Sequence, residues 1–145
     1  MDTIRVKKLR PEAKLPTYGS AEAAGADLYA CLEADVVIEP GKSAFIPTGI
    51  AMEVPRGCAG LIYARSGMAC KRGLAPANKV GVVDSDYRGE FMVVLHNHSD
   101  QPQTVCHGER IAQLLITPVL TPGYTEVEEL SATVRSGGGF GSTGK

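Results

Sequence analysis

The stretch SAFIPTGIAMEVPRGCAGLIYA, residues 43–64, decides the fold class. It contains two short runs rich in aliphatic and aromatic residues, 43–54 and 58–64, with the breaker Pro55-Arg56-Gly57 between them. Short apolar runs bounded by such breakers are typical of β-strands, because a helix would need a longer stretch with a repeat near 3.6 residues. The stretch therefore predicts two strands joined by a turn.

The same pattern continues on both sides of this stretch. Breakers such as Pro40-Gly41 and His107-Gly108 separate most of the further apolar runs, and only residues 67–72 could form a short helix. The further runs occupy residues 3–9, 26–31, 36–38, 80–83, 90–97, 104–106 and 110–119. Many short strands with turns between them predict an all-β sandwich, barrel or jelly roll with at most one short helix.

Length and charge exclude several classes of function. A chain of 145 residues predicts one domain. The net charge of −1 gives no reason to expect a nucleic-acid backbone or a membrane surface as a partner. No run reaches the ~18 apolar residues of a membrane span, and the start of the chain lacks the apolar core of a signal peptide. We expect a cytoplasmic protein.

Cysteines and histidines suggest no metal centre. The cysteines form no Cys-x-x-Cys pair, which argues against a zinc knuckle and a disulfide framework, and we predict that they are small buried or half-buried residues: Cys31, Cys58, Cys70 and Cys106. A strand would place His96 and His98 on one face, but no second spaced pair of ligands supports a metal site there. Polar residues at a strand end are the favoured interpretation.

One apolar strand carries two polar residues. In RIAQLLI, residues 110–116, strict alternation predicts that Arg110 and Gln113 lie on opposite faces. A buried arginine or glutamine needs a polar partner. Each of the two side chains is therefore either satisfied structurally or directed at a ligand.

Two internal segments could carry chemistry. In GVVDSDYRG, residues 81–89, Asp84 and Asp86 stand beside Tyr87, although this segment alone is most simply an ordinary hairpin turn. Arg65-Ser66-Gly67 could likewise be a turn, or an anion site built from a hydroxyl, amides and a guanidinium.

The tail RSGGGFGSTGK, residues 135–145, contains too much glycine to pack as a strand. One interpretation is a disordered terminus. The other is an arm that becomes ordered on an anion, through its backbone N–H groups and Arg135.

Five segments together are far more specific than any one of them. AGADL (24–28), ARSGM (64–68), GVVDSDYRG (81–89), GERIAQL (108–114) and residues 135–144 resemble, in order and spacing, the five motifs of the homotrimeric dUTPase family. The resemblance implies a distorted jelly-roll or β-barrel domain over residues 1–134, with an arm, 135–145, that closes over an active site. It also implies a homotrimer whose sites are shared between subunits.

The resemblance further implies that dUTP is hydrolysed to dUMP and pyrophosphate by attack of water on the α-phosphorus. Asp84 would deprotonate that water. The phosphates would be held by Arg65, Ser66, Gly67, Gln113, Arg135, Gly141, Ser142 and Thr143. The uracil and deoxyribose would contact Asn78, Gly81, Val83, Tyr87, Met68 and Phe140. A Mg²⁺ ion would be held mainly by the triphosphate, with Asp27 reaching it only through water.

Three positions depart from the family pattern. Ala64 stands where proline is common, Glu109 where aspartate is frequent, and Ser136 where glycine is usual. Serine makes a positive φ costly in the arm. Two other functions stay open: a dCTP deaminase, which shares the fold, and a trimer that senses dUTP and signals to a protein partner.

Overall fold

The computed structural model describes residues 3–144, so Met1 and Asp2 of the predicted domain and Lys145 of the predicted arm lie outside the described residues. The predicted all-β fold with one short helix is confirmed. Its elements are β1 (Val6–Lys8), β2 (Thr17–Tyr18), β3 (Ala26–Tyr29), β4 (Val36–Ile38), β5 (Ser43–Pro47), β6 (Ile50–Met52), β7 (Cys58–Tyr63), α1 (Ser66–Arg72), β8 (Leu74–Pro76), β9 (Gly81–Val83), β10 (Met92–Asn97), β11 (Gln103–Val105) and β12 (Arg110–Pro118).

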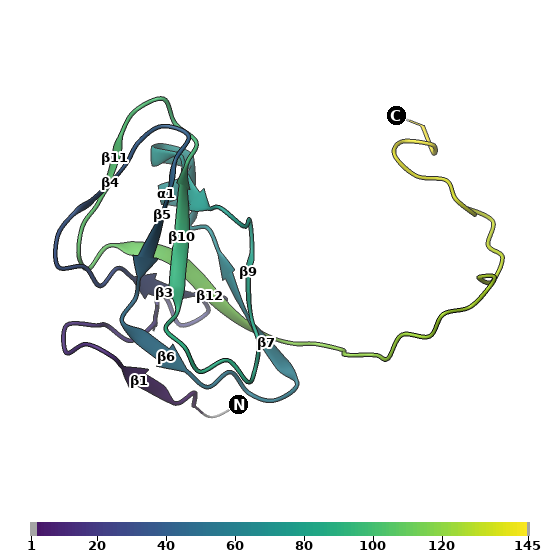
Figure 1. Ribbon diagram of the computed structural model, residues 1–145, viewed down its shortest axis with the longest axis horizontal. Coiled ribbons are helices and arrows are strands. Elements are labelled where there is room, and N and C mark those ends of the chain that lie inside the picture. The colour runs from purple at the N-terminus through teal and green to yellow at the C-terminus, as the bar shows by residue number, and fades with distance from the viewer. Residues whose placement is uncertain (1–2, 145) are drawn as a thin grey trace.

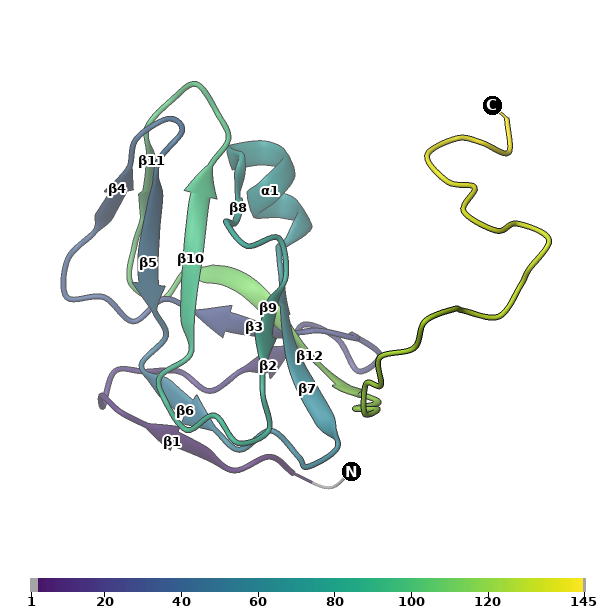
Figure 2. The same ribbon diagram turned by 45° about the vertical axis from the view of Figure 1, so that its right-hand side comes forward.

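The strands form antiparallel sheets that pack around one core (Figures 1 and 2). The largest sheet has the order β2-β3-β12-β7-β9, and a second has the order β5-β10-β8. Two smaller pairs, β1-β6 and β4-β11, complete the body. These sheets do not close into a continuous barrel within residues 3–144.

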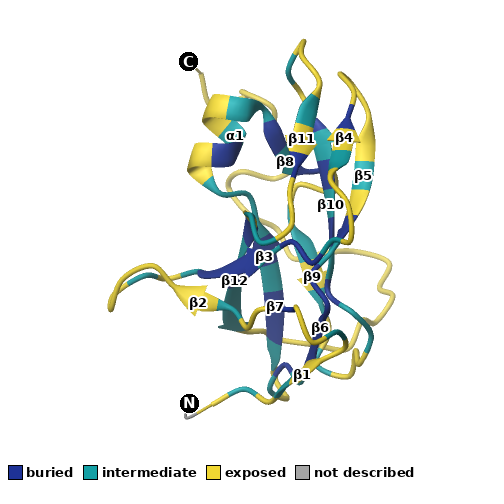
Figure 3. Ribbon diagram, turned by 90° about the vertical axis from the view of Figure 1, so that its left-hand side faces the viewer, coloured by how far each residue is buried: buried dark blue, intermediate teal, exposed yellow. Residues whose placement is uncertain are grey.

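Alternation of side chains explains why the sheets enclose a core. In β10 the residues alternate between half-buried and fully buried positions, so one face of the strand points inward. Leu28, Ile46 and Leu95, from three different strands, are completely buried. Figure 3 shows buried segments on β3, β7 and β12 of the largest sheet and on β10 of the second sheet. The core thereby fixes the strands that carry the site.

The apolar run 43–54 forms two strands rather than one. Gly49 has a φ of 71° and separates β5 from β6. A Cβ added there would lie 2.8 Å from the Cβ of Ala13, so only glycine fits. The strands β2 and β8 were not predicted, because two or three residues are too few for a recognisable alternation.

The helix appears where it was predicted. It ends at Gly73, whose φ of 65° places it in the left-handed region and whose N–H bonds the carbonyl oxygens of Met68 and Ala69. Ser66 and Gly67 begin the helix and are exposed. Their backbone N–H groups belong to the first turn, which has no intrahelical acceptors for them.

A β-bulge makes the prediction for Arg110 and Gln113 wrong. The register of β12 against β3 shifts between Arg110 and Ala112, so Arg110 pairs with Tyr29 while Gln113 pairs with Asp27. One extra residue reverses the side-chain alternation beyond it. Arg110 and Gln113 therefore lie on the same face, together with Asp27.

The cysteines are only partly as predicted. Cys31 is buried and Cys58 is half-buried, but Cys70 and Cys106 are exposed, so the prediction is wrong for these two. Cys70 lies on the short helix, of which only Met68 is buried, and Cys106 lies in the turn that precedes β12. A small apolar side chain can occupy such surface positions at little cost.

Beyond β12 the chain leaves the body. Residues 119–144 form no helix or strand, and Figure 1 shows them running away from the sheets. Leu120, Tyr124 and Leu130 are each at least 89% exposed, although they are large apolar residues. In the part of the chain that the structure describes, no helix is both long and apolar enough to cross a membrane.

Candidate active site

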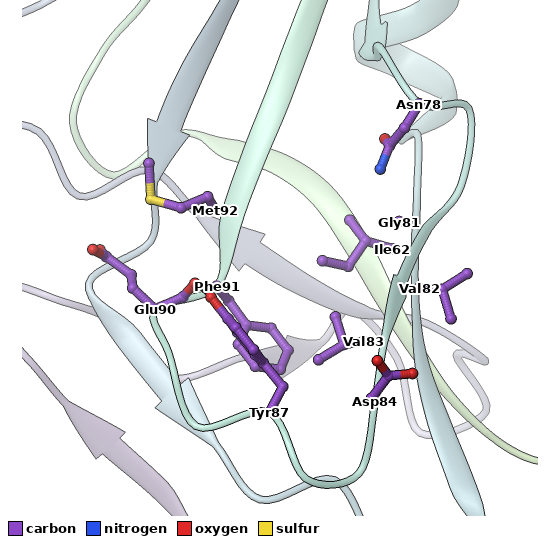
Figure 4. A pocket seen from close by; sticks show the side chains of 10 residues that line it. All are labelled: Ile62, Asn78, Gly81, Val82, Val83, Asp84, Tyr87, Glu90, Phe91 and Met92. Atoms are coloured by element: carbon purple, nitrogen blue, oxygen red, sulfur yellow. Dashed lines mark hydrogen bonds between the residues drawn. The ribbon is translucent and has the colours of Figure 1, made fainter.

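A pocket of about 220 Å³ opens between the strands that flank the predicted hairpin turn. Figure 4 shows Asn78 and Ile62 on one side of it, and Glu90, Phe91 and Met92 on the other. Its lining consists of Ile62, Asn78, Gly81, Val82, Val83, Asp84, Tyr87, Glu90, Phe91 and Met92. Four predicted ligands of uracil and deoxyribose line this pocket: Asn78, Gly81, Val83 and Tyr87. The predicted general base, Asp84, lines it too.

The interpretation of residues 81–89 as an ordinary hairpin turn is wrong, because the strands on either side of the turn belong to different sheets and do not pair with each other. The pocket opens between them. Gly81–Val83 form β9, which pairs only with β7, whereas β10 pairs with β5 and β8. Because β9 is an edge strand, half of its backbone N–H and C=O groups lack a strand partner. These groups, with the exposed amide of Asn78, can bond a planar polar ligand.

Two predicted carboxylates have opposite environments. Asp27 is 8% exposed; its Oδ1 accepts from Arg65 Nε at 2.7 Å and its Oδ2 from Arg110 Nη1 at 3.4 Å. Asp84 is exposed, and none of the salt bridges among residues 3–144 involves it. Of the two, only Asp84 can readily accept a proton from a water molecule in the pocket.

Tyr87 is held in one position by its neighbours. Its hydroxyl donates to the carbonyl oxygen of Glu90 at 2.9 Å, and its ring lies 6.2 Å from that of Phe91, measured between centroids. A Cβ added to Gly89 would lie 2.4 Å from the Tyr87 hydroxyl. Glycine at position 89 therefore lets the ring fold back over the loop at the edge of the pocket.

The predicted phosphate ligands of the body lie on a different face. Arg65, Gly67 and Met68 line a groove of about 520 Å³ that also contains Arg110 and Tyr29. Ion pairing with Asp27 orients the Arg65 guanidinium, which also donates through Nη1 to the Arg110 carbonyl at 3.4 Å. Beside it are the free amides of the first helical turn. This face can bind an anion.

Gln113 is oriented by a glycine that was not predicted to matter. Its Nε2 donates to the carbonyl of Ala64 at 2.9 Å. A Cβ added to Gly25 would lie 2.4 Å from Gln113 Oε1 and 3.1 Å from Gln113 Cβ. The side chain of Gln113 therefore packs directly onto the backbone of Gly25.

The predicted residues of the arm lie apart from both faces. Phe140 is fully exposed, and Arg135 Nε donates to the carbonyl of Gly138 at 2.7 Å, within the arm itself. Figure 1 shows this segment away from the sheets. One chain thus does not bring Gly141, Ser142 and Thr143 to the pocket or to the groove.

Sequence reasoning missed several residues of the site. Glu90, Phe91 and Met92 line the pocket, and Met68, predicted near the base or sugar, lies in the core and lines the Arg65 groove instead. Glu90 follows the DSDYRG segment directly, so its position beside that turn was the one available signal. Nothing in the sequence indicated that Gly25 packs against Gln113.

The described residues offer no cage for a metal ion. No three side chains among the His, Cys, Asp and Glu residues of 3–144 are close enough to hold one. His96 and His98 stack edge to face at 4.5 Å, whereas His107 Nδ1 accepts the N–H of Leu32 at 3.1 Å. A metal ion bound at these residues would therefore need further ligands from outside the chain, such as a bound substrate or another subunit.

Known proteins similar to this chain share its length and fold. The dUTPase family model matches residues 11–144. A deoxyuridine 5'-triphosphate nucleotidohydrolase from Syntrophotalea carbinolica is 48% identical over 98% of this chain and 97% of that protein. One from Desulfotalea psychrophila is 51% identical over 90% of this chain and 87% of that protein. The solved structure of the Staphylococcus bacteriophage 80alpha dUTPase with dUPNHPP has a TM-score of 0.90 at 31% identity, with 100% of both chains covered.

Proposed function

The chain belongs to the dUTPase family, and on that premise we propose that it hydrolyses dUTP to dUMP and pyrophosphate. The observation that carries the proposal is the pocket between β9 and β10, where an exposed carboxylate, an exposed amide and an edge strand meet. Such an enzyme would keep uracil out of DNA and supply dUMP for dTMP synthesis. The cytoplasmic location stays a prediction.

Asp84 is the proposed general base. A general base must lie within hydrogen-bond reach of the water that it deprotonates and must be free to accept the proton. The exposure of Asp84 at the pocket and its absence from the salt bridges of the described residues support this role. The deprotonated water attacks the α-phosphorus, and pyrophosphate leaves.

The pocket is proposed to bind uracil and deoxyribose. The free edge of β9 at Gly81 and Val83, with the amide of Asn78, can form hydrogen bonds with the polar edge of a base. The close approach of this segment to the base is proposed to exclude the methyl group of thymine. The ring of Tyr87, folded over Gly89 at the rim, would pack beneath the sugar and exclude a 2′-hydroxyl group.

Two further sets of residues are proposed to bind the triphosphate. In the body these are Arg65, Ser66, Gly67 and Gln113; in the arm they are Arg135, Gly141, Ser142 and Thr143, while Phe140 stacks on the uracil. A Mg²⁺ ion bound with the triphosphate would neutralise negative charge there. Asp27, already paired with two arginines, would contact that ion only through water.

A homotrimer with shared sites is part of the proposal. The pocket of about 220 Å³ is smaller than the roughly 300–1,000 Å³ that is usual for a small-molecule site, which supports completion by other subunits. The exposed apolar residues of the C-terminal segment support the same arrangement. The complete site would take Asp84, the phosphate groove and the arm from three different subunits.

Product analysis tests the reaction. The purified protein is incubated with dUTP or dCTP and Mg²⁺, and pyrophosphate, nucleotides and ammonia are measured. The proposal predicts dUMP and pyrophosphate from dUTP. Ammonia from dCTP would indicate a deaminase instead, and tight dUTP binding without turnover would indicate a sensor with a protein partner.

A further inference from the structure

Three segments that are distant in the sequence meet at Glu90, near the end of the loop between β9 and β10. The guanidinium of Arg10 pairs with Glu90 Oε1, and the backbone N–H of Gly49 donates to the same oxygen at 2.7 Å. The N–H of Leu9 donates to the Gly49 carbonyl at 2.7 Å, so both polar groups of Gly49 are engaged. Figure 4 shows the Glu90 side chain pointing away from the pocket. The loop is therefore anchored from behind.

The residue after Glu90 is anchored to the same region. The N–H of Phe91 donates to the carbonyl of Ile50 at 2.9 Å, and the hydroxyl of Thr48 donates to the Phe91 carbonyl at 2.5 Å. Phe91 is 1% exposed and Thr48 is completely buried. Figure 2 shows the loop beside β6, in agreement with these bonds. The backbone at the end of the loop is thus fixed to the body.

The ion pair at Glu90 is better shielded than a typical surface pair. The Glu90 side chain is 22% exposed and that of Arg10 is 36% exposed. Hydrogen bonds with Cys31 and Glu90 raise the pKa of Arg10 above its ordinary value. Shielding strengthens the attraction, and removing one partner leaves the other without compensation.

Tyr87 depends on this anchor for its position. Its hydroxyl donates to the Glu90 carbonyl oxygen at 2.9 Å, while its ring rests on Gly89. Any shift of the Glu90 backbone therefore moves the acceptor of the Tyr87 hydroxyl. Arg10 lies outside the lining of this pocket, whereas its partner Glu90 is part of that lining, so an effect of Arg10 on a nucleotide bound there would pass through Glu90.

We propose that Arg10 is a positioning residue for Tyr87, and that through Glu90 it sets the discrimination between deoxyribose and ribose in the substrate. This inference rests on the proposed function, because it concerns the selectivity of the same site. It assigns a role to a residue that lies outside all five motif-like segments and 80 positions from its partner.

The first test compares kcat/KM for dUTP and UTP in Arg10→Ala and Glu90→Gln. Both variants should lower the dUTP/UTP ratio by about tenfold, the factor expected when one hydrogen bond of a charged group is lost. Arg10→Lys keeps the positive charge and should retain most of the ratio. Arg72→Ala is the control, since it breaks the similarly shielded pair with Glu109. Both residues line the groove proposed for the triphosphate, which dUTP and UTP share, so any loss of kcat/KM should be equal for the two nucleotides and the ratio should stay unchanged.

A double-mutant cycle separates positioning from general destabilisation. Tyr87→Phe removes the hydroxyl that bonds Glu90 and should also lower the ratio. If Arg10 acts through that hydroxyl, Arg10→Ala combined with Tyr87→Phe should lower the ratio no further than Tyr87→Phe alone. Additive losses, or an unchanged ratio in Arg10→Ala and Glu90→Gln, would overturn the inference.

A second readout does not depend on turnover. The ring signals of Tyr87 in an NMR spectrum of tyrosine-labelled protein can be assigned by their loss in Tyr87→Phe. They should shift in Arg10→Ala and stay in place in Arg72→Ala. Unshifted signals in Arg10→Ala overturn the inference even if the protein proves not to hydrolyse dUTP. If the signals shift but the protein does not hydrolyse dUTP, only the proposed function is contradicted. Arg10 would then still position Tyr87.

Discussion

The hairpin segment, residues 81–91, and the arm, residues 135–144, both carry predicted site residues, but only the hairpin segment is assembled by its own chain. Pairing with β7 and the anchor at Glu90 hold the hairpin segment, so its polar groups already face a pocket. The arm has only local hydrogen bonds, such as that from Arg135 to Gly138, and its Phe140 is fully exposed. The difference predicts that selectivity is built into the hairpin segment, whereas the arm adds affinity only when it closes.

The largest expected effect is the choice of base. A site that reads a base by hydrogen bonds rejects analogues that leave its polar groups unpaired by about 10⁴-fold or more, so kcat/KM should be that much higher for dUTP than for dCTP. Because the arm is proposed to grip phosphates and to stack on any base, deleting residues 135–145 should leave this ratio intact. Assays of pyrophosphate release measure this ratio for the full-length protein and for the deletion variant. Comparable hydrolysis of dUTP and dCTP would show that the hairpin segment does not recognise the base.

Loss of the proposed general base, Asp84, should have the second largest effect on activity. Asp84→Asn should retain the fold and nucleotide binding but lose about 10²–10⁴-fold in kcat, because an amide cannot accept the proton of the attacking water. Asp86→Asn changes a second exposed carboxylate of the same turn and is the matched control. Near-parental turnover by Asp84→Asn would mean that Asp84 is only a turn residue.

Deleting residues 135–145 should lower kcat/KM by roughly 100-fold or more, the loss expected for about two hydrogen bonds to a charged phosphate. The trimer should persist, because the deletion keeps Leu120, Tyr124 and Leu130, the exposed apolar residues of the segment that is proposed to pack on other subunits. Co-expression of this deletion with Asp84→Asn should restore partial activity, because some mixed trimers place an intact arm over an intact Asp84.

The co-expression experiment needs two controls. Mass spectrometry must detect the mixed trimers, and a mixture in which both chains carry Asp84→Asn must remain inactive. If mixed trimers form and show no activity, the arm serves its own subunit or no site at all. The model of a shared site would then be wrong.

A smaller effect is expected at Gly25, on the phosphate face of the body. Gly25→Ala forces the side chain of Gln113 aside, since the new Cβ would lie 2.4 Å from Oε1. We expect about a tenfold loss in kcat/KM for dUTP, corresponding to one hydrogen bond to a charged group. Gly19→Ala is the control, because an added Cβ there meets nothing within 4 Å. Equal activity of the two variants would show that Gln113 does not bind phosphate.

The same comparison explains what could be predicted from the sequence. Short apolar runs indicated the all-β fold, and five motif-like segments indicated the family, because both depend on local patterns. The anchor of Arg10 on Glu90 joins residues 80 positions apart, and the bulge that places Arg110 and Gln113 on one face depends on strand register. Neither leaves a local signal. The surface over which the arm closes is proposed to belong to another subunit, so the sequence of one chain does not indicate it either.

The smallest expected effect tests the backbone of the arm. Ser136 has a φ of 45°, a region that costs a non-glycine residue roughly 1–2 kcal/mol. Ser136→Gly removes this cost. Glycine also gives the open arm more backbone conformations, and losing them on closure opposes closure by about 0.4–1 kcal/mol. The net gain is at most about 1.5 kcal/mol, so we expect kcat/KM to rise by up to roughly tenfold. Ser131→Gly adds the same looseness at a position without a positive φ, and it should lower kcat/KM slightly. If Ser136→Gly also lowers kcat/KM, the closed arm does not use this left-handed conformation, and Ser136 departs from the family pattern without penalty.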